Sequence, residues 1–510
     1  MPAICVRRRH GSSRAWPAPT KPARCQSLVT QPHARRDAAS ALCDARACFF
    51  ARDPHTPMTS PDSSATPATS MPPIAALDAA TMDPTSLDST VLGTRDAVPG
   101  VAAPSAAAVA TRTSRIPSLA IMLAAMAMLG PFSIDAYLPA FPEIEASLSA
   151  SAIQVQQTMT AYLLAFAVMI LWHGAISDSL GRRNVILVSL AVFVVASLGC
   201  ASAHSIQYLW AFRILQGVSA GAGIVVGRAM VRDLYEGAAA EKLLALVTMI
   251  FAIAPAIAPI LGGWIVATFD WRTIFLALFV YAALLFWACW RRLPETLPPH
   301  QRRPFNARSL WTSYKTVFGT LRFHMYAGTM ALNFAGLFLY VAAAPAFVIG
   351  QLHQSAQGFG WMFIPSVSGI FLGALLANRL AGRLLIGRQV RIGFMLMGGA
   401  ALANLVYHTL FPPQVPWSVI PLFFYTIGMS LTAPGVTLMV LDLFPAYRGV
   451  AASCQSFAQT LLASLVAGVI APLLSASALW LAAGQVTFVA AALVAWRIGR
   501  SRRFAGPRAA

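Results

Sequence analysis

Residues 174–183 read Gly-Ala-Ile-Ser-Asp-Ser-Leu-Gly-Arg-Arg. They cover the end of one uncharged apolar segment, residues 157–177, and lead to the next, residues 184–203. Each segment has about the 20 residues that an α-helix needs to cross a hydrocarbon core about 30 Å thick. The two glycines permit a tight turn, and a carboxylate with two arginines can hold helix ends together. The stretch therefore predicts a charged turn between two membrane helices. A turn that only sets topology is the alternative. We expect this turn to act as a gate by holding helix ends together in one conformation. The expected gate residues are Gly174, Asp178, Gly181, Arg182, Arg183 and, after a later helix, Asp233.

The apolar pattern continues on both sides of this turn. The chain has 510 residues, of which 57% are hydrophobic and 11% charged, and its mean hydropathy is +0.64. We expect an all-α integral membrane protein with twelve transmembrane helices in two six-helix bundles. The apolar runs lie at about 117–141, 157–177, 184–203, 206–231, 241–268 and 273–291, and then at about 323–349, 358–380, 390–411, 416–440, 448–474 and 477–497.

The basic residues indicate the orientation. One set of alternate connections holds clusters such as Arg182–Arg183, Arg291–Arg292 and Arg388–Arg391, whereas the other set has Arg272 as its single basic residue. By the positive-inside rule, both termini are predicted to be cytoplasmic. The net charge of +19 is spread over short loops and forms no continuous stripe, so we expect no nucleic-acid partner.

The domain boundaries follow from changes in composition. Residues 1–115 are rich in Ala, Pro, Ser and Thr, and we expect a disordered cytoplasmic tail that includes an upstream extension if Met58, Met71 or Met82 is the initiator. The other expected parts are an N-terminal bundle at 116–291, a cytoplasmic central loop at 292–320, a C-terminal bundle at 321–498 and a basic tail at 499–510.

The two halves repeat each other in outline. Residues 230–235, Met-Val-Arg-Asp-Leu-Tyr, match residues 439–444, Met-Val-Leu-Asp-Leu-Phe, and Asp178 with Arg183 corresponds to Asn378 with Arg383. The two offsets, 209 and 200 residues, are nearly equal. This similarity predicts a duplicated, pseudo-symmetric bundle with a central site at the interface.

Two ionisable residues lie inside apolar spans. Asp135 is the one acidic residue that falls within a predicted helix rather than at its end, and Arg213 lies about seven residues from the outer start of its helix. An intramembrane charge is a functional hypothesis by default, and the helical rise puts both residues in the outer half of the membrane, where they could meet. We therefore expect Asp135 and Arg213 to couple proton binding to transport. The alternatives are a solvated cap or gate for Asp135 and a structural pairing for Arg213.

A third group lies in the fifth run. Pro255 and Pro259 remove backbone donors and bend the helix, while Gly262 and Gly263 permit close contact with a neighbour; a simple kink is the alternative. The sequence indicates the residues of the substrate cavity less specifically. The aromatic and polar candidates are Tyr137, Phe141, Tyr162, Phe166, Asn333, Phe338 and Tyr340. No cysteine or histidine spacing suggests a metal or haem site.

These motifs resemble known ones. Residues 174–183 resemble the cytoplasmic signature loop of the major facilitator superfamily, residues 209–217 its helix 4 motif with an embedded arginine, and residues 254–263 its antiporter motif, with Ala258 where a glycine normally precedes the proline. Residues 132–140, 232–235 and 293–297 are similar to the bicyclomycin/chloramphenicol-resistance (Bcr/CflA) branch of drug:proton antiporters. The resemblance covers about residues 116–500.

The resemblance implies proton-coupled efflux of a drug or metabolite across a bacterial-type inner membrane by alternating access. Uptake of a small metabolite is the main alternative, because the fold is compatible with either direction. A membrane enzyme would need a convergent set of acid/base or nucleophilic groups near one interface, whereas the sequence offers only isolated acids. A receptor-like or non-transporting scaffold is a further alternative. The expected partners are a small-molecule substrate, protons and the lipid bilayer; we expect no cofactor beyond the proton gradient, no metal, and a functional monomer.

Overall fold

The computed structural model describes residues 106–302 and 304–501. The expected tail up to residue 105 and the arginines beyond residue 501 lie outside the described residues. Within the described residues all regular secondary structure is helical, and twelve helices are long and apolar enough to cross a membrane. The predicted all-α membrane architecture with twelve spans is thereby confirmed.

The N-terminal half contains six spans, of which the first and the fifth are interrupted. Prolines explain both interruptions, because Pro139 follows the end of the first helix and Pro255 is the second residue of the second part of the fifth. The elements are α1 (Ala106–Asp135), η1 (Leu138–Ala140), α2 (Phe141–Ser147), α3 (Ala152–Leu180), α4 (Arg182–Ala201), α5 (Ile206–Leu234), α6 (Gly237–Phe251), α7 (Ala254–Thr268) and α8 (Arg272–Arg292).

The C-terminal half also contains six spans. Two π-helical segments occur here: η3 follows the seventh span of the chain, and η6 lies within the eleventh. The elements are α10 (Leu321–Ala342), η3 (Pro345–Gln351), η4 (Ala356–Phe359), α11 (Gly360–Leu380), α12 (Ile386–Leu410), α13 (Ile420–Asp442), η5 (Pro445–Tyr447), α14 (Arg448–Leu465), η6 (Val466–Ile470), α15 (Ala471–Leu474) and α16 (Ala478–Arg500).

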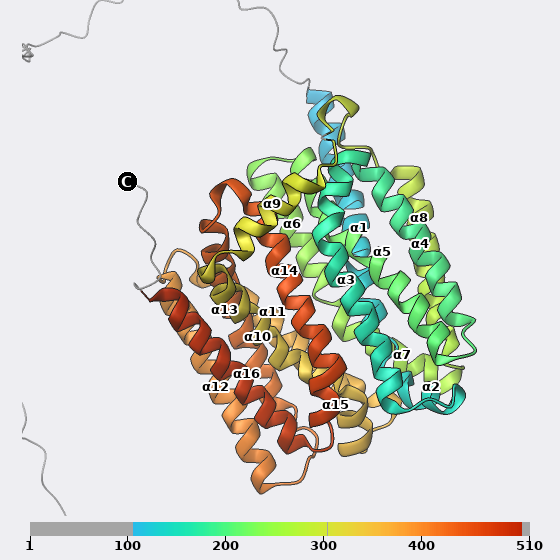
Figure 1. Cartoon of the computed structure of the whole chain (residues 1–510), viewed down its shortest axis with the longest axis vertical. Coiled ribbons are helices and arrows are strands. Elements are labelled where there is room, and N and C mark those ends of the chain that lie inside the picture. Colours follow the sequence, from blue (N-terminus) through green and yellow to red (C-terminus); the bar gives the residue numbers. More distant parts are fainter. Residues whose placement is uncertain (1–105, 303, 502–510) are drawn as a thin grey trace, which may run out of the picture. The chain divides into compact units, whose positions relative to one another are not determined.

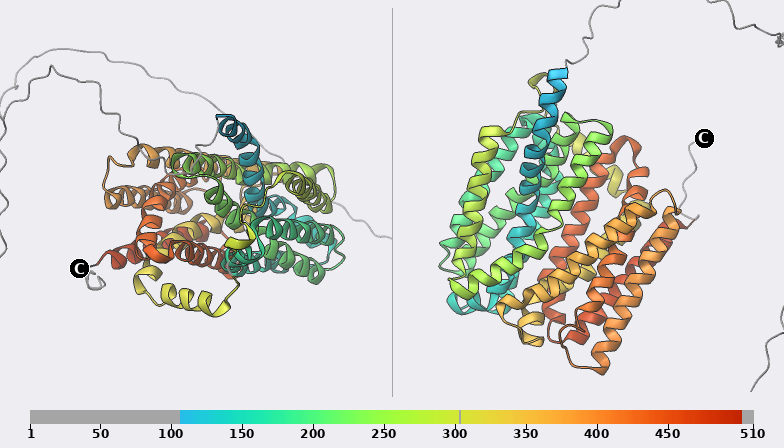
Figure 2. Two further views of the ribbon diagram at one scale, coloured as in Figure 1. Left: turned by 90° about the horizontal axis from the view of Figure 1, so that it is seen from above. Right: turned by 180° about the vertical axis from the view of Figure 1, so that it is seen from behind.

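The helices form two groups that follow the chain order. The blue-to-green helices α1–α8 pack on one another, as do the yellow-to-red helices α10–α16 (Figure 1; Figure 2). The interface between the groups is made mainly by α3 with α14 and η6, and by α7 with α11 and η4. The chain thus folds into two six-span groups that face each other mainly across α3 and α14.

The outer end of this interface is held by two adjacent glutamines of α3. Gln156 Nε2 donates to the carbonyl oxygen of Ala342 at 3.1 Å, and Gln157 Nε2 donates to the carbonyl oxygen of Gly468 in η6 at 2.9 Å. Gly468 lies so close to α3 that an added Cβ would come within 2.8 Å of Thr160. The two halves are therefore in tight contact at the end of the molecule that we expect to face outward.

The connection between the halves contains a helix that we did not expect from the sequence. Within residues 292–320, η2 (Pro299–Gln301) is followed by α9 (Ala307–Phe318), which packs on α10 and α14. The hydroxyl of Tyr314 in α9 donates to the carbonyl oxygen of Leu171 in α3, so this helix touches both halves. The signal available in the sequence was the recurrence of Trp311, Tyr314 and Val317 at every third position among polar residues, which is close to the helical repeat.

The start of the first helix also differs from the expected boundary. α1 begins at Ala106, ten residues before the predicted start of the bundle at residue 116. Residues 106–110 are Ala-Ala-Ala-Val-Ala, and alanine has the highest helix propensity, so a helix that starts in this segment is physically reasonable. The membrane-spanning part still begins at Leu119.

Candidate functional site

Asp135 lies at a break in the first span. It is the last residue of α1, and the chain continues through a turn into η1, whose Pro139 cannot extend the helix. The Asp135 side chain is only 5% exposed. Among the described residues no hydrogen bond or ion pair involves its carboxyl group, so a charge at this position has no direct counter-ion. A discontinuous helix with an ionisable group at the break is a typical arrangement of ion and substrate sites in transporters.

Arg213 of α5 lies beside the same break and is fully buried. Its Nη1 donates to the carbonyl oxygen of Ser133 at 3.1 Å and to Oε1 of Gln216 at 2.9 Å. The last carbonyls of a helix lack partners within the helix, and cations near this end are favoured by the helix dipole. Arg213 therefore caps the end of α1, which explains how a guanidinium is accommodated inside an apolar span.

Aromatic rings complete the surroundings of Arg213. Its guanidinium carbon lies 4.3 Å from the ring centroid of Tyr137 and 4.5 Å from that of Tyr162. Both distances are within the range of cation–π contact, which is strongest where water is excluded. Nε and Nη2 of Arg213 are buried without a hydrogen-bond partner among the described atoms, so this cation retains donors that a substrate, a water or a carboxylate could use.

A chain of hydrogen bonds connects Arg213 to neighbouring helices. Gln216, which accepts from Arg213, donates through Nε2 to the hydroxyl of Ser197 in α4 at 2.9 Å. Tyr137 Oη and Thr158 Oγ1 are 3.0 Å apart, and Ser133 Oγ donates to Tyr162 Oη at 3.0 Å. These contacts connect α1, α3, α4 and α5. We refer to Arg213, Gln216, Ser197 and the two tyrosines Tyr137 and Tyr162 as the N-half polar cluster.

The structure brings Asp135 and Arg213 to the same end of α1 but does not pair them. Arg213 contacts the backbone two residues before Asp135, and no ion pair within 4.0 Å joins the two side chains among the described residues. The proximity that we expected from helix depth is present, whereas a direct salt bridge is not. The reason is that α1 ends at Asp135. The carbonyl groups in the last turn of α1 compete with the Asp135 carboxyl group for the guanidinium of Arg213.

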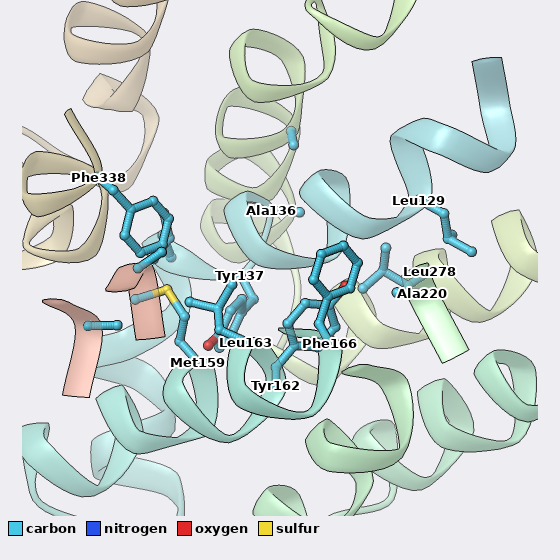
Figure 3. Packing of buried hydrophobic residues seen from close by; sticks show 14 of the residues in the cluster. Leu129, Ala136, Tyr137, Met159, Tyr162, Leu163, Phe166, Ala220, Leu278 and Phe338 are labelled. Atoms are coloured by element: carbon cyan, nitrogen blue, oxygen red, sulfur yellow. The ribbon is translucent and has the colours of Figure 1, made fainter. Parts of the chain in front are cut away.

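Five of the seven cavity candidates gather around this site. Figure 3 shows Tyr137, Tyr162 and Phe166 close to Ala136, with Phe338 of α10 on the same side as Met159. Tyr137 also lies 5.1 Å from Phe141, and Tyr162 stacks on Phe166 at 6.1 Å, measured between ring centroids. Phe338 belongs to the C-terminal half, so the aromatic group spans the interface between the two halves.

The other two candidates, Tyr340 and Asn333, lie inside the C-terminal half. Tyr340 Oη accepts from Asn404 Nδ2 at 2.6 Å, and the same nitrogen donates to Gln485 Oε1 at 3.1 Å. Asn333 Nδ2 donates to Thr432 Oγ1 at 3.3 Å. Their polar groups face other helices of their own half. We refer to Tyr340, Asn404 and Gln485 as the C-half polar cluster; it contains no charged side chain.

The proline–glycine motif of the fifth span connects the site to the interface. A Cβ added at Gly262 would overlap the carbonyl oxygen of Ala136, next to Asp135, and one added at Gly263 would overlap the carbonyl oxygen of Ala356 in the opposite half. Pro255 is the second residue of α7, and Pro259 lies inside it. The two adjacent glycines thus let α7 touch the end of α1 and the C-terminal half at once, a closer approach than any side chain would permit.

The expected gate residues meet at the ends of α3, α4 and α5. Arg182 pairs with Asp178, and its Nε lies 3.2 Å from Oδ2 of Asp233. Arg183 donates to the backbone of Trp290 at 2.8 Å. Gly181 has a φ of +96°, a left-handed conformation that favours glycine, whereas Gly174 packs at ordinary distance from Val225.

The sequence reasoning did not include Glu295 and Arg302 among the gate residues. Glu295 Oε1 accepts from the backbone N–H of Arg182 at 3.0 Å, where it caps the start of α4, and its Oε2 pairs with Arg302 Nη2 at 3.5 Å. A Cβ at Gly181 would collide with both side chains. The available signal was the sequence Leu-Pro-Glu-Thr-Leu at residues 293–297, which is part of the resemblance to the Bcr/CflA branch.

Comparisons with known proteins agree with this arrangement. A family profile described as Major Facilitator Superfamily matches residues 123–467. A Bacillus subtilis protein named uncharacterized MFS-type transporter YdgK is 38% identical over 324 residues, which are 62% of this chain and 79% of that protein. The bicyclomycin resistance protein homolog of Haemophilus influenzae is 30% identical over 276 residues, 53% of this chain and 68% of that protein.

The fold is similar to that of solved transporters. The crystal structure of a D-xylose-proton symporter superimposes with a TM-score of 0.59 and 16% identity, over 75% of this chain and 97% of that one. At this identity the likeness concerns the fold alone. With a family match over more than half of the 510 residues, relatives at 30% identity or above and a shared fold, this chain belongs to the Major Facilitator Superfamily of membrane transporters, in its bicyclomycin/chloramphenicol-resistance branch.

Proposed function

We propose that this protein exports small molecules in exchange for protons, with Asp135 as the group that binds and releases the proton. The observation that carries the proposal is the position of Asp135: a buried carboxyl group with no counter-ion among the described residues, at the break of a spanning helix and beside a buried arginine. Arginine cannot readily lose its proton, whereas a carboxyl group can change charge inside the site.

The motion follows from the contacts of α7. The state of charge at Asp135 changes the electrostatic balance at the end of α1, where Gly262 touches the Ala136 carbonyl. Because Gly263 touches the opposite half, a shift of the end of α1 is passed on to the interface between the halves. Proton binding and substrate release then become opposed states of one alternating-access cycle.

The polar and aromatic surroundings favour a broad range of substrates. Phe141, Phe166 and Phe338 offer apolar ring faces, and Arg213 keeps two buried nitrogens without a partner among the described atoms. A site of this composition holds an amphiphilic molecule by stacking and by a few hydrogen bonds. The bicyclomycin resistance protein homolog among the relatives favours an antibiotic or a compound of similar polarity as the substrate.

The direction of transport is set by the proton gradient. We propose that the protein lies in a bacterial inner membrane as a monomer with both termini in the cytoplasm, in line with the basic residues at the ends of α4, α8 and α16. A membrane potential of about 100 mV contributes about 2.3 kcal/mol per charge moved, enough for a roughly 50-fold gradient before any pH difference.

The test uses inverted membrane vesicles, in which export from the cell becomes accumulation inside the vesicle. With an imposed proton gradient, wild-type protein should accumulate radiolabelled chloramphenicol, and dissipation of the gradient by an uncoupler should release it. Asp135→Asn should abolish accumulation against the gradient while retaining exchange of substrate at equal concentrations. Asp442→Asn, an acid at the end of α13, serves as the matched control and should transport normally.

Two outcomes would overturn the proposal. Accumulation by Asp135→Asn at the wild-type level would place the proton-coupling group elsewhere. Accumulation in right-side-out vesicles but not in inverted ones, across a panel of antibiotics and amino acids, would identify the protein as an uptake carrier.

A further inference from the structure

A groove on the C-terminal half lies away from the transport site. It is a cavity of about 560 Å³ between the start of α12 and the end of α16. These two helices pack on each other and on α10 and α13, and they are side by side in Figure 1, whereas the interface with the N-terminal half is made by α11 and α14. The lining residues are Arg388, Arg391, Ile392, Phe394, Met395, Leu493, Trp496 and Arg497.

The charges of the groove all have the same sign. Arg388, Arg391 and Arg497 are exposed, and no acidic residue lines the cavity. Across residues 106–302 and 304–501, the ion pairs present use Arg182, Arg272 and Arg302, so none of these three guanidinium groups is neutralised by a carboxylate. Three cations that line one groove, two from α12 and one from α16, repel one another unless an anion lies between them.

A fourth cation lies beside the groove. The guanidinium carbon of Arg500 is 4.8 Å from the ring centroid of Trp496, and a Cβ at Gly387 would lie 3.0 Å from its Nη1. The groove is therefore bounded on this side by an arginine that is itself positioned by an aromatic ring. Planar guanidinium groups arranged in this way suit a phosphate, which accepts two parallel hydrogen bonds from each.

The remainder of the lining is apolar and runs deeper into the membrane span. Phe394 packs on Trp496 with 5.6 Å between ring centroids, and the side chain of Met395 is 67% exposed. From Arg388 to Met395 the helix rises about 10 Å, which is within the roughly 15 Å of one leaflet's hydrocarbon. The groove thus has a basic end at the level of the head groups and an apolar end at the level of the acyl chains.

We propose that this groove binds an anionic phospholipid of the cytoplasmic leaflet, with its phosphate among Arg388, Arg391 and Arg497 and an acyl chain along Met395 and Leu493. The charge favours an anion, and the apolar floor favours a lipid over a small inorganic ion. Basic pockets at the cytoplasmic ends of transmembrane helices are suited to such head groups. The assignment to the cytoplasmic leaflet rests on the proposed orientation, with both termini in the cytoplasm. The groove itself does not depend on the transported substrate.

The experiment measures lipid binding by the purified full-length chain. Native mass spectrometry in detergent, with added palmitoyl-oleoyl phosphatidylglycerol or the phosphatidylcholine of the same chains, should show one retained phosphatidylglycerol and no comparable retention of phosphatidylcholine. Arg388→Gln, Arg391→Gln and Arg497→Gln combined should weaken phosphatidylglycerol binding about 100-fold, because each cation near the surface contributes about fivefold. The corresponding triple lysine variant should keep most of the binding, since the charges remain.

The matched control removes three cytoplasmic arginines elsewhere: Arg291→Gln, Arg292→Gln and Arg308→Gln combined. It should bind phosphatidylglycerol like the wild type, and inorganic phosphate should not compete at millimolar concentration. Equal retention of both lipids, equal loss in the two glutamine triples, or displacement of the lipid by inorganic phosphate would each overturn the proposal. The unfolding temperature without added lipid checks that each variant is folded, and the lysine triple preserves the test if the glutamine triple is not.

Discussion

The two halves of the molecule place different chemistry in the parts that we expect to face outward. The N-half polar cluster contains a buried guanidinium that caps a broken helix, and a carboxyl group that has no counter-ion within residues 106–302 and 304–501 lies at the same break. The C-half polar cluster is made of a tyrosine, an asparagine and a glutamine, all neutral and fully buried. The opposite ends, which we expect to face the cytoplasm, differ in the same way: Asp178 pairs with Arg182, whereas the corresponding residue in the second half is the uncharged Asn378.

This difference suggests a division of labour between similar folds. A duplicated bundle needs only one titrating site if the other half serves as the rigid body against which it moves. Neutral hydrogen-bonded groups specify packing without a change of charge during the cycle. The following substitutions test whether the asymmetry is functional, from the largest expected effect to the smallest.

The largest effect is expected for Arg213→Met compared with Gln485→Leu. Arg213→Met leaves the Ser133 carbonyl and the Gln216 side chain without their charged donor, so we expect transport to fall about 100-fold or more. Gln485→Leu removes one neutral hydrogen bond to Asn404 and should reduce transport less than about tenfold. Initial rates in vesicles, normalised to the amount of protein in the membrane, measure both. Similar losses would contradict a division between the halves.

The next effect concerns the contact between the halves. A valine at Gly263 would overlap the Ala356 carbonyl, whereas nothing lies within 4 Å of a Cβ at Gly398, so Gly398→Val is the matched control. Overpacking of this kind costs about 1–3 kcal/mol, and we expect Gly263→Val to reduce transport about tenfold or more by forcing the outer contact open. Transport rates and the unfolding temperature of the purified protein are the measurements. Transport by Gly263→Val at the level of Gly398→Val would show that the close approach in the structure is not needed for transport.

A smaller effect is expected at the cytoplasmic ends. The Asp178 side chain is 46% exposed, so solvent screens its pair with Arg182 and removal of the charge is worth about 1 kcal/mol at most, or about fivefold in rate. We expect Asp178→Asn to lower turnover by up to this amount and Asn378→Ala to change it less than about twofold. Glu295→Gln should resemble Asp178→Asn, because Glu295 caps the start of α4 and pairs with Arg302. Equal defects from Asp178→Asn and Asn378→Ala would remove this part of the asymmetry.

Much of the fold was predictable because the membrane imposes a simple length and polarity rule on every span. The predicted run 206–231 corresponds to α5 at Ile206–Leu234, and 358–380 to α11 with its preceding η4. Helix α9 was missed because its polar face lowers its mean hydropathy, and the rule detects only helices that are apolar on all sides.

The site was predictable in type but not in geometry. Asp135 and Arg213 stand out because charges in apolar spans are costly. That Arg213 contacts the Ser133 carbonyl instead of the Asp135 side chain depends on where α1 ends, which hydropathy does not indicate. Tyr340 was grouped with the cavity residues by its type and helix, but its hydroxyl faces Asn404 within the C-terminal half, and the helical rotation that decides this is set by packing.

The smallest effect, and the finest test of the comparison, is the removal of one hydroxyl group from each cluster. Tyr340→Phe removes the acceptor of Asn404 Nδ2, which keeps its bond to Gln485, and Tyr137→Phe removes the contact with Thr158 but keeps the ring on Arg213. Each variant should lose about 1 kcal/mol of stability and change transport less than about twofold, because a neutral hydrogen bond contributes little on balance. Chemical denaturation of the purified protein and vesicle transport measure the two effects.

Extending the pair to leucine separates the halves: Tyr137→Leu also removes the cation–π contact and should impair transport, whereas Tyr340→Leu should lower stability more than transport. A transport defect in Tyr340→Phe as large as that in Tyr137→Leu would mean that the neutral cluster takes part in the cycle, and the C-terminal half could then no longer be regarded as the passive partner.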